Sequence, residues 1–174
     1  MSTDPLGRYF RAMEHSPALG KVPPLQTRRT DASDPEFRTL VQALDKDLAV
    51  RDGDEHAFFA QFNGLQDIKH VVLVHNEEEV LGCGAFKTYD AGSAEIKRMY
   101  VAPQHRRKGV ASVVLRELEA WARSEGHFRC ILETGKKQPE AIALYQRAGY
   151  RLTPNYGQYA GVESSLCFEK RLDR

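Results

Sequence analysis

Apolar residues recur three to four positions apart in three stretches of the chain, and this spacing is typical of amphipathic helices. The first stretch follows Pro35, the second follows Gly109 and the third follows Pro139. Aspartate and serine side chains within residues 31–34 can cap the first helix, and Pro139 suits the first turn of the last one. Residues 55–62 contain three phenylalanines and predict a further short helix. The pattern therefore predicts about four helices.

Shorter runs rich in apolar and β-branched residues lie between these helices and predict strands. The run HVVLVH, for example, has the continuous apolar centre of a buried strand. The strand after the Gly109 helix should lie parallel to the strand before that helix, because a helical crossover joins them. The prediction is an α/β fold with a mixed sheet of about seven strands, at residues 25–30, 70–75, 80–89, 94–101, 128–133, 150–153 and 165–172.

Residues 1–24 lack a clear period and contain four of the eight prolines, which predicts an N-terminal arm or tail. Residues 25–174 are enough for one domain with its own core. The formal net charge is +1, so no overall field draws the protein to nucleic acid or to a membrane. There is neither a run of about 18 apolar residues nor a signal-peptide segment, so we expect a cytoplasmic protein.

The three cysteines, Cys83, Cys130 and Cys167, lie in apolar runs that are expected to form strands. Their number is odd and they show no C-x-x-C spacing, which does not suit a disulfide framework or a zinc site. We therefore expect buried thiols and no bound metal.

A basic turn lies between a predicted strand and a predicted helix. It places Arg106, Arg107 and Lys108 directly before Gly109. The first N–H groups of the helix have no partner inside it, and the helix dipole adds partial positive charge there. Gly109 has no Cβ, so the backbone can approach a bulky anion closely. We predict a pyrophosphate cradle, with a solvated basic turn as the alternative. The residue orders of a Walker loop and of a dinucleotide fingerprint are both missing.

The order Arg106-x-x-Gly109-x-Ala111 resembles the R/Q-x-x-G-x-G/A signature of the GNAT acetyltransferase superfamily, which binds acyl-coenzyme A. Two further motifs agree with it, LY-x-x-x-GY at residues 144–150 and the closing strand SLCFEKRL. The order of elements from about residue 25 to 172 also resembles the GNAT fold, and the chain looks like a bacterial branch of small GNAT enzymes. The resemblance implies an acyl-CoA-dependent N-acetyltransferase that uses acetyl-CoA and forms a homodimer.

The resemblance also implies how the coenzyme is held. The strand before the signature would offer backbone groups to the pantetheine arm, and the signature would hold the pyrophosphate. Gln138 stands where the family often has an asparagine that contacts the coenzyme arm, and its longer side chain offers the same amide groups. The implied coenzyme-binding residues are Met99, Tyr100, Val101, Arg106, Arg107, Lys108, Gly109, Val110, Ala111, Ser112 and Gln138.

For catalysis, the resemblance makes Tyr145 the acid that protonates the departing thiolate, and the alternative is a packing role for a half-buried aromatic residue. Glu95, on a predicted strand, is the expected base that takes the proton of the amine, although it is equally an ordinary edge charge. Glu133, at the end of the fifth predicted strand, is the second candidate for the base. We expect the acceptor pocket to contain Tyr156, Tyr159 and Phe58.

These features predict acetyl transfer to a primary amine of a small molecule or an amino acid. A peptide or protein amine is an alternative acceptor, and a non-catalytic acyl-CoA sensor is an alternative function. A nucleic-acid-binding protein is disfavoured, because the net charge is small and no aromatic residues interleave with a basic face.

Overall fold

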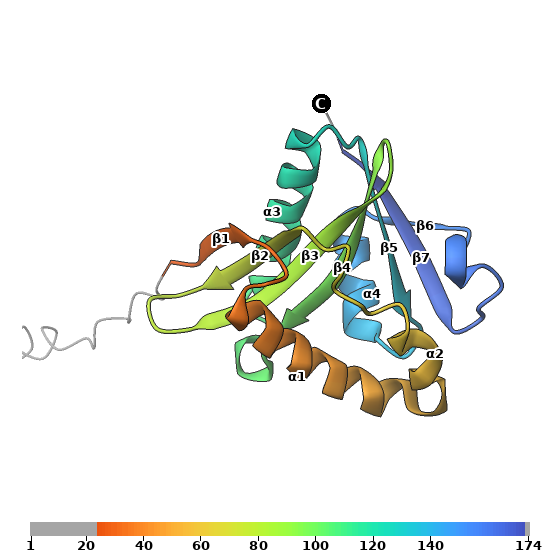
Figure 1. The fold of residues 1–174 in the computed structure, drawn as a ribbon, viewed down its shortest axis with the longest axis horizontal. Coiled ribbons are helices and arrows are strands. Elements are labelled where there is room, and N and C mark those ends of the chain that lie inside the picture. Colours follow the sequence, from red (N-terminus) through yellow and green to blue (C-terminus); the bar gives the residue numbers. More distant parts are fainter. Residues whose placement is uncertain (1–23, 173–174) are drawn as a thin grey trace, which may run out of the picture.

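The computed structural model describes residues 24–172, so the predicted N-terminal arm lies outside the described residues apart from Pro24. Seven strands form one mixed sheet in the order β1-β2-β3-β4-β5-β7-β6 (Figure 1). The helices are α1 (Pro35–Asp52), α2 (His56–Ala60), α3 (Val110–Ser124) and α4 (Pro139–Arg147). The strands are β1 (Gln26–Thr30), β2 (His70–His75), β3 (Val80–Asp90), β4 (Ser93–Val101), β5 (Arg129–Gly135), β6 (Arg151–Thr153) and β7 (Ser165–Arg171). The predicted mixed α/β fold is confirmed.

Local sequence signals explain where the helices begin and end. The carboxylate of Asp34 accepts hydrogen bonds from the backbone N–H groups of Glu36, at 2.9 Å, and Phe37, at 3.3 Å, and so caps α1. Gly53, with φ of 57°, ends α1 in a conformation that suits glycine. The start of α1 that was predicted from capping residues within residues 31–34 is therefore confirmed.

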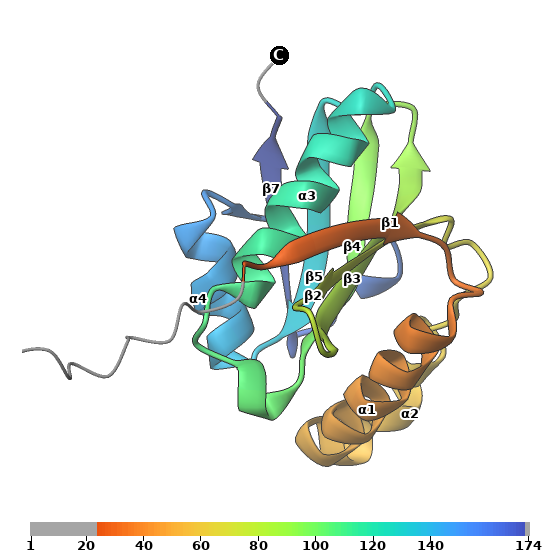
Figure 2. The ribbon, with the colours of Figure 1, turned by 90° about the vertical axis from the view of Figure 1, so that its left-hand side faces the viewer.

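Each face of the sheet has its own apolar core, because successive side chains of a strand point to opposite faces. Ala94 and Ile96 of β4 pack in a cluster with Val114 and Leu118 of α3. On the other face, Cys83 and Ala85 of β3 and Tyr100 of β4 pack in a cluster with Phe37 and Val41 of α1. Helices α3 and α4 therefore cover one face, and α1 and α2 cover the other (Figure 2).

Strands β4 and β5 are parallel neighbours at their beginnings only. Their register runs from Ser93↔Arg129 to Glu95↔Ile131 and includes three pairs. Beyond these pairs β4 keeps only β3 as its partner, β5 keeps only β7, and the two strands diverge (Figure 1). We call this unpaired region, residues 96–101 of β4 and 132–135 of β5, the β4–β5 split. It leaves backbone groups in the middle of the sheet without a strand partner.

A β-bulge in β4 lies beside the split. Lys97 pairs with Ala85 and Tyr100 pairs with Cys83, so two residues of β4 lie opposite a single residue of β3. Arg98, within the bulge, has φ of 58°, which is unusual for a residue other than glycine. A bulge leaves one residue unpaired and changes the direction of the strand.

None of the helices within residues 24–172 combines the length and apolarity that a membrane crossing requires.

Candidate active site

The N-terminus of α3 is an open backbone anion site. Gly109 is its N-cap, with φ of 78°, and no side chain caps the helix. Arg107 also has a positive φ, 63°, so the turn before the helix is tightly wound. Among the described residues, no hydrogen bond is donated by the backbone N–H groups of residues 107–112, and the first donor is Val113, which bonds the carbonyl of Gly109 at 3.1 Å. Free N–H groups and the helix dipole make this turn suitable for a phosphate.

The three cations of the turn do not have the same surroundings. Arg107 and Lys108 are exposed. Arg106 turns back onto the protein, where its Nε donates to the carbonyl of Val101 at 3.0 Å and its guanidinium lies 3.4 Å from the carboxylate of Asp47. The Arg106 side chain, although partly exposed, therefore holds the turn against the end of β4 and against α1, whereas the other two cations are exposed.

Ion pairs continue from Arg106 along α1 to α4. Asp47 also contacts the Arg51 guanidinium at 3.6 Å, and Arg51 pairs with Glu140 in the first turn of α4. Helix α1 is thus tied both to the turn before α3 and to α4, on the two sides of the split (Figure 1). We call the chain Arg106–Asp47–Arg51–Glu140 the α1 strap.

Two predicted residues lie on the α4 side of the split. Gln138 is the N-cap of α4, and its amide lies close to Gly135 at the end of β5. Tyr145 is 6% exposed and packs edge-on against Tyr150, with 5.8 Å between ring centroids. Its hydroxyl makes no hydrogen bond within residues 24–172, and burial, reinforced by the charge of Glu133, raises the pKa of Tyr145 above its ordinary value. The phenol is therefore protonated, with its donor unused.

The α1–α2 face of the sheet carries the predicted base. The Glu95 side chain is 2% exposed and accepts a hydrogen bond from the Tyr156 hydroxyl at 3.0 Å. Its other oxygen lies 3.7 Å from the Lys87 ammonium and 3.9 Å from the Lys97 ammonium. The carboxylate is thus held in place by a hydroxyl donor and two nearby cations.

Glu133 projects from β5 on the same face, because its neighbours Cys130 and Leu132 belong to the core under α3. The Ser165 hydroxyl donates to its carboxylate at 2.6 Å. Burial raises the pKa of Glu133 to about 7. A carboxyl group with a pKa near neutrality is suited to accept a proton at physiological pH.

Aromatic rings form a continuous wall beside these carboxylates. Neighbouring rings make edge-to-face contacts, with centroid distances of 5.3 Å for Phe58–Phe62, 5.8 Å for Phe62–Tyr159, 5.9 Å for Tyr159–Tyr156 and 5.1 Å for Tyr156–Tyr89. We call these five residues the aromatic wall. The structure thus brings together the three predicted acceptor residues, Tyr156, Tyr159 and Phe58.

Two functional candidates were absent from the predicted site. Tyr89 joins the aromatic wall from the end of β3, and no local signal marks it, because its contact with Tyr156 spans 67 residues of sequence. Lys97 lies two residues after Glu95, and alternation along a strand could have placed both on one face. The sequence pattern alone did not show that its ammonium is buried.

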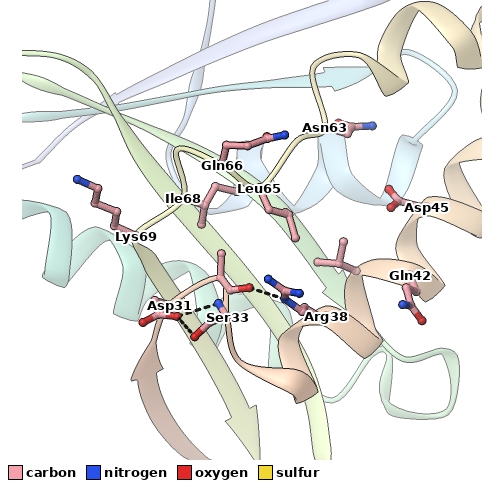
Figure 3. A pocket seen from close by; sticks show the side chains of 12 residues that line it. Asp31, Ser33, Arg38, Gln42, Asp45, Asn63, Leu65, Gln66, Ile68 and Lys69 are labelled. Atoms are coloured by element: carbon pink, nitrogen blue, oxygen red, sulfur yellow. Dashed lines mark hydrogen bonds between the residues drawn. The ribbon is translucent and has the colours of Figure 1, made fainter.

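A surface groove of about 960 Å³ lies elsewhere, between α1 and residues 63–69 (Figure 3). No predicted site residue lines it. Three of its polar side chains are engaged locally, since Ser33 donates to the Asp31 carboxylate and Arg38 donates to the carbonyl of Ala32 (Figure 3). The groove therefore carries no part of the candidate site.

The split connects the two halves of the site. The free N–H groups of the α3 turn, the Tyr145 hydroxyl and Gln138 lie around the α3–α4 side. Glu95, Glu133 and the aromatic wall lie on the α1–α2 side. An anionic ligand with a long arm can bind the turn and extend along the unpaired edge of β4, so that its far end meets a second reactant near the two carboxylates.

Comparison with known proteins gives consistent results. The profile of the Acetyltransferase (GNAT) family matches residues 31–150. An IAA acetyltransferase of Azospirillum brasilense is 33% identical over 137 residues, which are 76% of this chain and 88% of that protein.

Solved structures agree with these matches. A Klebsiella pneumoniae protein assigned as an acyl-CoA N-acyltransferase superimposes with a TM-score of 0.71 and 31% identity, over 86% of this chain and 98% of its own. A GNAT family acetyltransferase from Elizabethkingia anophelis, solved with acetyl-CoA bound, shares the fold with a TM-score of 0.62 and 19% identity, over 85% of this chain and 98% of its own.

Proposed function

Because this chain belongs to the GNAT family of acetyltransferases, we propose that it moves the acetyl group of acetyl-CoA to a primary amine of a small molecule or an amino acid. Acyl-CoA-dependent N-acetyl transfer is the activity of the family. The observation that carries the proposal is the split itself. It separates a backbone anion site at the N-terminus of α3 from the buried carboxylate of Glu95 and the half-buried carboxylate of Glu133 on the opposite face. Such a site suits a direct reaction between a bound thioester and an amine.

The coenzyme would be held mainly by backbone. We assign the pyrophosphate to the N–H groups of residues 107–112, which donate no hydrogen bonds within the described chain. The pantetheine arm would lie along Met99, Tyr100 and Val101, where β4 has no β5 partner. Gln138 would contact the arm from the opposite side of the split. The acetyl-CoA bound to the Elizabethkingia relative supports acetyl-CoA as the co-substrate.

The acceptor amine would bind between Glu95, Glu133 and the aromatic wall. An amine is mostly protonated at neutral pH, so a base must take a proton before the amine attacks the thioester carbon. The Glu133 pKa of about 7 favours Glu133 for this task. Glu95, chosen from the sequence, already accepts the Tyr156 hydrogen bond, which suits it to attract and orient the cationic amine. Separate variants of the two carboxylates distinguish these roles.

The remaining steps of the transfer need a hydrogen-bond donor for the acyl oxygen and a proton donor for the thiolate. As the amine attacks, negative charge develops on the acyl oxygen, and a β4 backbone N–H near Met99, beside the bulge, would stabilise it. The C–S bond then breaks and the departing thiolate takes a proton from the Tyr145 hydroxyl, while the second proton that the nitrogen loses as the amide forms replaces the one given up by Tyr145. No covalent acyl-enzyme is required, and the three described cysteines are all buried.

The proposal is tested by release of free thiol from acetyl-CoA with a panel of amines and amino acids, with product mass confirming N-acetylation. Peptides with free amines serve as a third class of acceptor. We expect thiol release that depends on a small acceptor. Acetyl-CoA binding without amine-dependent thiol release would contradict the proposal and favour the acyl-CoA sensor. The homodimer and the cytoplasmic location stay predictions, and sedimentation at micromolar concentration tests the first.

A further inference from the structure

Lys97 has a largely buried side chain, and its ammonium makes no hydrogen bond to another described residue. Its side chain is 8% exposed, and its ammonium lies 3.9 Å from the Glu95 carboxylate, beyond hydrogen-bonding distance. No hydrogen bond to this ammonium is present within residues 24–172. An ammonium has three donors, and burying it without partners is costly. In keeping with this, burial lowers the pKa of Lys97.

The neighbouring carboxylates do not depend on Lys97 for their hydrogen bonds. Glu95 receives the Tyr156 hydroxyl and Glu133 receives the Ser165 hydroxyl. Lys87 lies at a similar distance from Glu95, 3.7 Å, and its side chain is more exposed, at 29%. A counter-ion for Glu95 is therefore available nearer the surface. The Lys97 ammonium therefore remains available to bind a further anion that enters the site.

We propose that Lys97 binds a carboxylate group of the acceptor and thereby selects amino acids over simple amines. This inference rests on the proposed acetyl transfer. The amino and carboxylate groups of an α-amino acid are separated by one carbon, so both groups fit a small site that has carboxylates and an ammonium close together. The amine would lie toward Glu133, the carboxylate would pair with Lys97, and the side chain would pack against the aromatic wall. Each buried charge then has a partner of opposite sign.

The test uses matched pairs of acceptors, each an amino acid and the amine that remains when hydrogen replaces its carboxylate, such as phenylalanine and phenethylamine. Wild type should prefer the amino acid of each pair. Lys97→Met keeps the length and packing of the side chain but removes the charge. It should lower kcat/KM for amino acids by about 10- to 100-fold, mainly through KM, and change kcat/KM for the paired amines by less than about threefold.

Lys87→Met is the matched control, because it removes the other cation near Glu95. It should leave the preference for amino acids intact. If Lys97→Met lowers kcat/KM equally for both members of each pair, Lys97 acts only as a counter-ion of Glu95 and the proposal is overturned. So would a wild-type preference for the amines, or a loss of discrimination in Lys87→Met alone. Lys97→Gln, which keeps a hydrogen-bond donor, provides a second variant if Lys97→Met does not fold.

A binding measurement separates this inference from the proposed function. Calorimetric titration of amino acids into the coenzyme A complex of each variant needs no catalysis. Amino acids should bind wild type more tightly than Lys97→Met by a factor similar to the change in KM. If no acceptor causes the release of free thiol from acetyl-CoA, the proposed function fails for these acceptors. The difference in amino-acid affinity between wild type and Lys97→Met still decides the role of Lys97. Equal amino-acid affinities in the two proteins would overturn it.

Discussion

The proposed coenzyme cradle at the N-terminus of α3 is made from backbone, whereas the proposed acceptor site around Glu95 and Glu133 is made from side chains. The cradle consists of consecutive N–H groups, residues 107–112. The acceptor site instead gathers β3, β4, β5, the segment after α2 and the loop before β7. A backbone site tolerates most side-chain changes that do not block it. A side-chain site changes with each residue, so the first half can keep one ligand while the second half selects another.

The largest effect is expected where a side chain blocks the backbone site. Gly109→Glu should abolish acetyl-CoA binding, because a carboxylate would enter the phosphate site and the φ of 78° strains any residue with a Cβ. Isothermal calorimetry on the folded variant measures the affinity. Gly126→Glu is the control, since Gly126 has φ of 92° at the other end of α3 and also has open space around it. It should lose stability without losing affinity, and unchanged binding in Gly109→Glu would exclude the cradle.

The second-largest effect is expected from removing the Tyr145 hydroxyl, the proposed proton donor on the coenzyme side of the site. Tyr145→Phe removes only the hydroxyl, so kcat should fall by about 10²- to 10⁴-fold while acetyl-CoA affinity and Tm barely change. Steady-state kinetics and thermal unfolding measure these quantities. The matched control is Tyr150→Phe, because the adjacent Tyr150 hydroxyl is buried without a hydrogen-bond partner within the described residues. A kcat of Tyr145→Phe within about twofold of wild type would make Tyr145 a packing residue.

The third effect concerns the base. If Glu133 must be ionised, kcat/KM should rise as the pH increases through about 7, because its carboxyl loses its proton there. Glu133→Gln should lower kcat by about 10²-fold and remove this inflection. Glu95→Gln should weaken acceptor binding and keep the inflection. Profiles measured from pH 5 to 9 decide between the two carboxylates, and an inflection lost only in Glu95→Gln would make Glu95 the base.

The smallest effect is expected from the α1 strap, which links the two regions. Asp47→Asn breaks its contacts with Arg106 and Arg51, and these are partly exposed ion pairs that contribute little individually. Acetyl-CoA affinity should weaken only about two- to fivefold, and less at high salt. Glu117→Gln, which breaks the partly exposed pair with Arg29 at 2.8 Å, is the control away from the site. An effect of the same size in both variants would show that the strap has no specific role.

Local sequence signals predicted much of the fold. Asp34 caps α1 as its position before Pro35 suggests, and HVVLVH forms β2 over its full length. The turn before α3 was also predictable, because a glycine N-cap and free N–H groups depend on a few consecutive residues. The role of Arg106 was less predictable. Its side chain, which is partly exposed, binds Asp47, 59 residues away in sequence, whereas Arg107 and Lys108 are exposed.

The acceptor site shows where local reasoning ends. Phe58, Tyr156 and Tyr159 were expected from their segments, but only the fold places them in one aromatic wall with Tyr89. The sequence likewise offered Glu95 as the expected base and Glu133 as the second candidate, without information on the pKa of either. Burial separates them from ordinary surface acids, and burial depends on every element packed around them.

By itself, the sequence determined the elements, their order and the glycine turn of the proposed cradle, because periodicity, caps and turn geometry act over a few residues. Only the tertiary structure decided where β4 and β5 part and which side chains meet on the α1–α2 face. It also decided that the Lys97 side chain is largely buried and that its ammonium makes no hydrogen bond within the described chain. The physical reason is that pKa values, hydrogen-bond partners and ring contacts depend on distances through space, and residues far apart in the sequence set those distances.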